Sequence, residues 1–144
     1  MNRALMERNG KRIAKILEYV GYEDSAIIIE KDWDLQVFIS GKEEGCTTIE
    51  MCAYRDYNGD ALFDPLMRIG LSTDEDGNIQ SAKAVYYLSR SLFADEEIYA
   101  KDDPECRDPG LYEKSRGLLD ERLSLWLDNI DRRGYLTEGR IEKI

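Results

Sequence analysis

Two spacings of apolar residues alternate along this chain, and each predicts a different kind of element. Within residues 1–21 the apolar positions recur every three or four residues, which is typical of the buried face of an α-helix. They are Ile13, Ile16, Leu17 and Val20. Gly21 is expected to end this helix, because glycine adopts the left-handed backbone that closes many helices. Its start is left open between Asn2 and the residue after Gly10, since an internal glycine costs about 1 kcal/mol relative to alanine.

From Ala26 to Leu88 the spacing changes to two residues, which indicates β-strands with one face towards a core. The runs lie at residues 26–30, 33–40, 46–55, 66–72 and 79–88. The connections between them are short, so neighbouring strands are expected to run antiparallel. The residues expected to face the core are Trp33, Leu35, Val37, Ile39, Ile49, Met51, Ala53, Met67, Ile69, Leu71, Ala82, Ala84, Tyr86 and Leu88.

A second helix is predicted over residues 111–134, after a proline-containing loop at residues 89–110. Its apolar residues spread over more than a third of the helical circumference, which suits a helix packed on a sheet. They include Leu118, Leu119, Leu123, Leu125, Trp126 and Ile130. The pattern as a whole predicts a single α+β domain over residues 1–144, an antiparallel four- to five-stranded meander packed against N-terminal and C-terminal helices. The tail from Thr137 is polar enough that we expect it to fray.

The negative charge of the chain is concentrated in its middle. The formal net charge is −10, and residues 21–110 hold 8 basic and 21 acidic side chains, whereas residues 1–20 carry a net charge of +3. An acidic surface repels nucleic-acid phosphates, so we expect no direct nucleic-acid binding by this segment and a basic protein as the partner. The alternative is left open that the acidity only keeps the protein soluble.

The compartment follows from the N-terminal residues and the cysteines. The N-terminus is charged where a secretory signal would be apolar, and no run of about 18 apolar residues follows. Cys46, Cys52 and Cys106 form no C-x-x-C pair. We therefore expect three free thiols, a cytoplasmic location and no membrane insertion.

The absence of histidine is the most informative chemical feature, because it removes imidazole as a base, proton shuttle or metal ligand. Asp56, Asn58 and Asp60 resemble the opening of a calcium loop, but Ala61 and Met67 stand where that loop requires glycine and glutamate. A hairpin turn explains the segment without an ion. We expect no metal, no cofactor and no catalytic residue. A small carboxylate-dependent, metal-assisted enzyme of unknown substrate is the alternative.

One motif follows the third run of alternating residues. It consists of Asn58, Gly59, Asp60, Asp64, Pro65 and Met67. The segment resembles a family of uncharacterised domains carried by phages, plasmids and other mobile elements, although Leu66 stands where an acidic residue is more usual. The resemblance implies a mobile-element setting and no particular activity. Physically the motif predicts a hairpin, in which Asp60 and Asp64 accept backbone N–H groups and Pro65 fixes the entry to the next strand.

These observations predict a non-enzymatic accessory factor of a mobile element that binds a basic protein. One such partner would be a host defence enzyme that the chain inhibits by occupying its nucleic-acid groove. The expected partner-facing residues are Glu43, Glu44, Asp74, Glu75, Asp76, Asp95, Glu96, Glu97, Asp102 and Asp103. In an alternating meander the first turn, at residues 41–45, and the third, at residues 74–78, project from the same end of the sheet. Their carboxylates would therefore form one patch. A merely solvated edge is the alternative.

Overall fold

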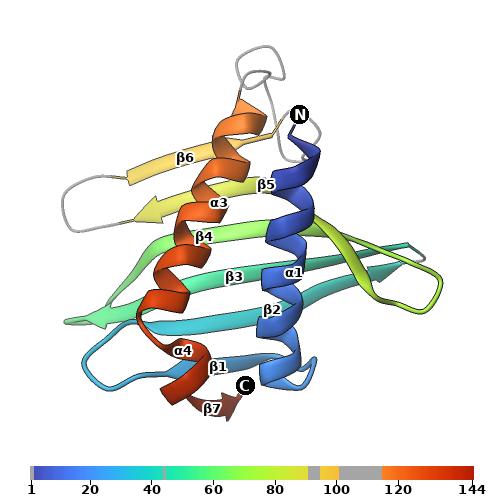
Figure 1. Ribbon diagram of the computed structural model, residues 1–144. Coiled ribbons are helices and arrows are strands. Elements are labelled where there is room, and N and C mark those ends of the chain that lie inside the picture. Colours follow the sequence, from blue (N-terminus) through green and yellow to red (C-terminus); the bar gives the residue numbers. More distant parts are fainter. Residues whose placement is uncertain (1, 44, 91–94, 101–114) are drawn as a thin grey trace.

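The computed structural model has two layers, an antiparallel β-sheet and helices that lie on one of its faces (Figure 1). It describes residues 2–43, 45–90, 95–100 and 115–144. The helices are α1 (Arg3–Val20), α3 (Ser115–Arg132) and α4 (Tyr135–Glu138). The strands are β1 (Ser25–Ile28), β2 (Asp34–Glu43), β3 (Cys46–Tyr57), β4 (Asp60–Thr73), β5 (Ile79–Arg90), β6 (Asp95–Tyr99) and β7 (Arg140–Lys143). The predicted α+β class is confirmed, with N-terminal and C-terminal helices packed on an antiparallel sheet.

The sheet has more strands than the sequence predicts. Within the described residues seven strands pair in the order β6-β5-β4-β3-β2-β1-β7, against the four to five expected. Strand β6 lies inside the segment predicted as a loop, and β7 lies in the tail expected to fray. Both are short edge strands of four or five residues that pair with one neighbour. An edge strand with little buried surface does not need alternating apolar residues, so neither strand left a signal in the sequence.

Helix α1 begins at Arg3 and contains Gly10 in its interior, which settles the alternative left open above. The Asn2 side chain accepts a hydrogen bond from the N–H of Leu5 at 3.0 Å and caps the first turn. At Gly10 the helix lies so close to β5 that an added Cβ would be 2.8 Å from the Cα of Ser81. The absence of a Cβ at Gly10 therefore allows the helix to pack closely on the sheet, and this contact offsets the poor helix propensity of glycine.

Helices α1 and α3 are joined to the sheet by a buried polar network. The Asn9 side chain donates to the carbonyl oxygen of Asp120 at 3.2 Å. The carboxylate of Asp120 accepts the N–H of Ala84, in β5, also at 3.2 Å. Asn9 and Asp120 are both almost fully buried, and these hydrogen bonds offset part of the cost of burying them, although Oδ1 of Asn9 has no hydrogen-bond partner among the described residues. The network fixes how the two helices sit over β5.

The core lies between the helices and the central strands. Core-facing residues of β2, β3 and β4 are buried as the alternation predicts, and α1 covers them with its apolar stripe. The largest fully buried side chains are Ile13, Ile16, Leu17, Ile27, Leu35, Ile49, Met51, Met67, Ile69, Leu71, Leu119 and Leu123.

Among the described residues, no helix is both long and apolar enough to span a bilayer.

In β5 Tyr86 and Leu88 lie on the opposite face from the one predicted, although Tyr86 is buried there. An extra residue, Val85, stands where the register of β5 against β4 shifts. Beyond it Tyr86 pairs with Arg68, whose guanidinium lies 4.2 Å from the centre of the tyrosine ring. Tyr87 takes the place that packs against the core. One inserted residue exchanges the two faces of a strand, and simple alternation cannot show it.

The Asn58-Gly59 segment forms a two-residue hairpin turn between β3 and β4. Both residues have positive φ, 52° for Asn58 and 90° for Gly59, as the tight turn of a right-twisted hairpin requires. The side chain that accepts the N–H of Gly59, at 3.0 Å, belongs to Asp56 and not to Asp60 as predicted. Strand β4 begins directly after the turn, at Asp60, so it starts earlier than the predicted residue 66.

Candidate functional site

The β2–β3 and β4–β5 turns, which are the first and third turns of the predicted meander, lie together at one end of the sheet, beside the C-terminal part of α1 (Figure 1). The N–H of Thr73 donates to the carbonyl oxygen of Gly45 at 3.1 Å and ties the two turns together. Between them is a groove with a volume of 610 Å³, which we name the acidic groove. It is lined by Leu17, Tyr22, Ile39, Lys42, Glu43, Gly45, Thr47, Leu71, Thr73, Asp74, Glu75, Asp76, Gly77 and Ile79.

The acidic groove combines an apolar floor with a charged rim. The buried side chains of Leu17 and Leu71 form part of the floor, and Tyr22 stands beside them with 56% of its surface exposed. Four acidic residues and one lysine line the rim, so its formal charge is negative. Glu44, which the sequence places with this set, lies outside the described residues.

The carboxylate of Asp74 shapes the third turn from within. Its Oδ1 atom accepts the N–H groups of Asn78 and Asp76, each at 2.9 Å. Its Oδ2 atom accepts the side-chain amides of Asn78 and Gln80. The N–H of Asn78 lowers the pKa of Asp74 most, and with the side chain of Asn78 and the N–H of Asp76 it holds that pKa below its ordinary value. Asp74 is thus a turn-forming residue, and Glu43, Glu75 and Asp76 are the acids that the groove presents.

The remaining predicted acidic residues do not join this groove. Asp95, Glu96 and Glu97 lie on the edge strand β6. Glu96 forms an ion pair with Arg122, and Glu97 accepts the hydroxyl of Tyr86 at 2.6 Å. Asp102 and Asp103 lie outside the described residues. The structure therefore brings four of the ten predicted residues together and separates three of them.

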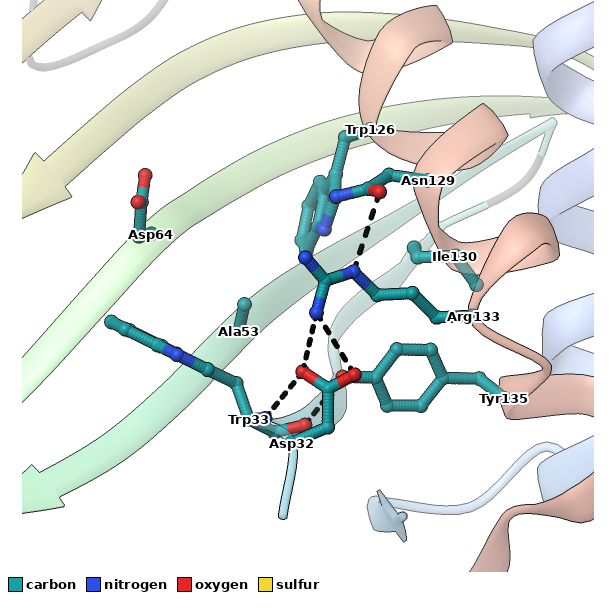
Figure 2. Close-up of a pocket in the computed structure, with 9 residues that line it drawn as sticks. All are labelled: Asp32, Trp33, Ala53, Asp64, Trp126, Asn129, Ile130, Arg133 and Tyr135. Atoms are coloured by element: carbon teal, nitrogen blue, oxygen red, sulfur yellow. Dashed lines mark hydrogen bonds and ion pairs between the residues drawn. The ribbon is translucent and has the colours of Figure 1, made fainter. Parts of the chain in front are cut away.

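A second hollow, which the sequence did not predict, lies between α3 and the sheet (Figure 2). We name it the tryptophan cavity, and its volume is 170 Å³. Trp33 just before β2, Trp126 on α3 and Asp64 on β4 surround it, with Ala53 of β3 between them. Asp32, Asn129, Ile130, Arg133 and Tyr135 complete the lining.

An ion pair closes one side of the tryptophan cavity. Nη1 of Arg133 donates to both oxygens of Asp32, at 2.8 and 2.9 Å. The N–H of Trp33 also donates to Asp32, and the hydroxyl of Tyr135 donates to the carbonyl oxygen of Trp33. Partial burial raises the pKa of Asp32, but Arg133 and the Trp33 N–H together outweigh it and leave the pKa below the ordinary 3.8. The loop that carries Trp33 is thereby fixed to the C-terminal end of α3.

On the opposite side of the cavity stands the carboxylate of Asp64. Its Oδ1 atom accepts the hydroxyl of Ser89 at 3.0 Å, whereas the sequence predicts that it accepts backbone N–H groups. Pro65 follows it within β4 through a cis peptide bond, so the proline does not mark the start of a strand. Asp64 lines the cavity on the side away from Asp32 and Arg133.

Sequence reasoning assigned both tryptophans to the core and so missed this cavity. Trp126 is indeed almost buried, with 8% of its surface exposed. The available signal was the spacing of Trp126 and Asn129 on α3 and of Arg133 directly after it, because residues three and four apart share a helix face. Polar residues that continue an apolar stripe indicate a place where the helix leaves the core. The partners Asp32 and Asp64 are distant in sequence, so no local pattern connects them.

The cysteines and carboxylates show no metal cluster in the described part of the chain. There, no three Cys, Asp or Glu side chains lie close enough to share an ion. Cys46 is exposed and Cys52 is buried, and burial raises the pKa of the Cys52 thiol to about 12. A thiol with such a pKa stays protonated and unreactive at neutral pH. Cys106 lies outside the described residues.

Comparison with known proteins gives no family for this chain. No protein-family model matches it, and neither a curated protein nor a solved structure shows detectable similarity to it.

Proposed function

We propose that the chain is a non-enzymatic protein-binding factor, and that its acidic groove holds a basic, amphipathic segment of a partner protein. The observation that supports this is the groove itself, in which an apolar floor lies beneath a rim of Glu43, Glu75 and Asp76. A segment with leucine-like and lysine-like side chains would bury the former on the floor and pair the latter with the rim.

The charge of the whole chain supports the same partner. With a formal net charge of −10, the molecule attracts basic surfaces from a distance and repels acidic ones. Proteins that bind nucleic acids present lysine and arginine clusters to phosphates, so they offer the required chemistry. We extend the proposal to such a partner, a nucleic-acid-binding enzyme that the chain would inhibit by covering its basic surface. The carboxylate-dependent enzyme gains no supporting observation from the described residues.

A defined peptide tests the groove without knowledge of the partner. The probe is a fluorescently labelled helical peptide with lysines on one face and leucines on the other. Binding is measured by fluorescence anisotropy at low and high salt. Two further peptides carry glutamate in place of lysine, or serine in place of leucine. We expect the first peptide to bind more tightly than both, and salt to weaken it, because the groove supplies both charge and apolar surface.

Matched charge reversals locate the binding surface. The groove variant carries Glu43→Lys, Glu75→Lys and Asp76→Lys and retains Asp74, which the turn requires. The control carries Asp60→Lys, Asp95→Lys and Glu121→Lys, three exposed acids outside the groove that give the same change in net charge. We expect the groove variant to bind at least about tenfold more weakly than the control, since each reversed pair is worth roughly 0.5–1 kcal/mol. Equal weakening in both variants would show that only net charge matters and would refute the groove.

A further inference from the structure

The two tryptophans of the chain meet in one cavity, although 92 positions separate Trp33 from Trp126. Figure 2 shows the indoles nearly edge-on, on two sides of Ala53, with Asp64 on a third side. Both rings border the cavity. Trp126 is held by α3, and Trp33 is held by the hydrogen bonds that its backbone makes with Asp32 and Tyr135. The backbone that carries each indole is thus anchored.

The charge of the lining favours a cation. Asp32, Asp64 and Arg133 are its charged residues, which gives a formal charge of −1. Both oxygens of Asp32 are occupied by Arg133, so this pair is internally neutral. Asp64 carries the remaining charge, and the contact that the structure shows for it is the neutral hydroxyl of Ser89. Indole faces are also negative, so they attract a cation into the cavity that Asp64 also lines.

The size of the cavity restricts that cation to a small group. Its volume, 170 Å³, is close to the roughly 150 Å³ of a cavity that accepts one benzene molecule. It is well below the roughly 300 Å³ at which sites for drug-sized ligands begin. A methylated ammonium head group is compact, weakly hydrated and positive, and its methyl groups can lie on indole faces.

We propose that the tryptophan cavity binds the head group of a small methylated ammonium ion between Trp33 and Trp126, with Asp64 as its counter-ion. The site is separate from the acidic groove, because the groove is built from the first and third turns and shares none of its lining residues with the cavity. The inference therefore stands whether or not the groove binds a basic segment.

The same head group occurs on free small molecules and on methylated lysine side chains of proteins. A hollow of 590 Å³ adjoins the cavity, and the two share Asp64, Trp126 and Asn129. Pro65, Tyr87, Arg122, the exposed Leu125 and Arg132 also line it, so its charged residues beside Asp64 are two arginines. It provides room for residues on either side of a modified lysine. Separate arms of the experiment below distinguish the two sources.

Intrinsic fluorescence provides a direct readout, since both tryptophans of the chain line the cavity. The unmodified protein is titrated with choline and, as a matched control, with 3,3-dimethylbutan-1-ol, which has the same shape but no charge. We expect a saturable change in tryptophan emission with choline and at least about fivefold weaker binding of the neutral compound. Equal binding of the two compounds, or no saturable change with choline, would overturn the proposal.

A second arm uses a short peptide with trimethyllysine and the same peptide with unmodified lysine. Tighter binding of the trimethyllysine peptide than of choline identifies a protein side chain as the source, and the reverse order identifies a free small molecule. Either order is compatible with the site, provided that the trimethyllysine peptide binds more tightly than the lysine peptide. Equal binding of both peptides contradicts the role of the methyl groups.

Variants then assign the roles of individual residues. Asp64→Asn removes the charge and keeps the shape, and we expect it to weaken choline binding about fivefold or more. The control is Asp60→Asn, which removes a carboxylate from the same strand outside the cavity and is expected to leave binding unchanged. Trp33→Leu is expected to abolish saturable binding, with circular dichroism to confirm that the fold is retained. If Asp64→Asn and Asp60→Asn bind choline equally, Asp64 is not the counter-ion and the proposal is wrong.

Discussion

Helices α1 and α3 have the same length, 18 residues, and lie side by side on the same face of the sheet, yet they contact it differently (Figure 1). Helix α1 approaches β5 closely at Gly10 and buries a continuous apolar stripe. Helix α3 is buried at Leu119, Leu123 and Leu127, but in its second half Trp126 and Asn129 border the tryptophan cavity. The comparison shows that one layer of helices can combine a closely packed half with a half that leaves a cavity against the sheet.

The largest effect is expected from truncation of the tryptophan on α3. Trp126→Ala should lower the free energy of unfolding by about 3 kcal/mol, at the lower end of the range for a buried aromatic residue. One side of the ring borders the cavity and so makes fewer packing contacts there. Urea denaturation followed by circular dichroism measures this loss without relying on tryptophan emission.

The neighbouring residue provides the control for that measurement. Leu125 is 67% exposed, so Leu125→Ala should change the free energy of unfolding by less than about 0.5 kcal/mol. A loss below about 1 kcal/mol for Trp126→Ala would show that the ring does not contribute to the core. In that case α3 as a whole, and not only its second half, would be less closely packed on the sheet than α1.

A pair of glycine substitutions sharpens the comparison at the level of the backbone. Gly10→Ala gains helix propensity but places a methyl group against the backbone of Ser81, and we expect a net loss of about 1–2 kcal/mol. Gly117→Ala, in α3, meets no atom within 4 Å and should stabilise the protein by about 0.5 kcal/mol. Thermal and urea denaturation measure both. If Gly10→Ala is also stabilising, the close approach of α1 to β5 is not needed for the fold.

The same two glycines show what the sequence can reveal. The apolar spacing around Ile13 and Ile16 predicts a helix correctly, because burial of one face requires that spacing. It cannot tell that Gly10 is a packing residue while Gly117 is exposed, since that difference depends on β5, which is remote in sequence. The bulge at Val85 and the edge strands β6 and β7 could not be predicted from the sequence for a related reason. Their positions depend on the pairing partner and not on their own pattern.

The two candidate sites also differ in how far the sequence predicts them. The acidic groove could be anticipated, because turns of an alternating meander meet at one end and their acids at 43 and 74–76 are visible in the sequence. That Asp74 serves the turn itself was not visible, since its partners become clear only from the folded loop. The tryptophan cavity joins residues of the loop before β2, of β3, of β4 and of α3. Each looks like a core or turn residue in its local context, so only the tertiary structure brings them together.

The smallest effect is expected at the ion pair that anchors the C-terminal end of α3. The pKa of Asp32 in the folded protein lies below the ordinary 3.8, so ionised Asp32 stabilises the fold. This stabilisation is complete above pH 3.8 and is lost as the pH falls below that value and through the lowered pKa. Arg133 remains charged throughout, because its pKa is far higher. At neutral pH, Asp32→Asn should cost no more than about 1 kcal/mol, since Arg133 is about half exposed and solvent screens the pair.

A double-mutant cycle isolates this contribution from other effects of the substitutions. Asp32→Asn, Arg133→Gln and the double variant are compared with the unmodified protein by urea denaturation at neutral pH and below pH 3.8. We expect a coupling energy of about 0.5–1 kcal/mol at neutral pH that decreases towards zero at the lower pH, where protonated Asp32 no longer attracts Arg133. A coupling that is zero at neutral pH, or that grows as the pH falls, would mean that the ion pair does not hold α3 to the loop of Trp33. The fixed position of Trp33 would then have to come from the Tyr135 hydroxyl and the packing around it, because these are the contacts that protonation of Asp32 leaves in place.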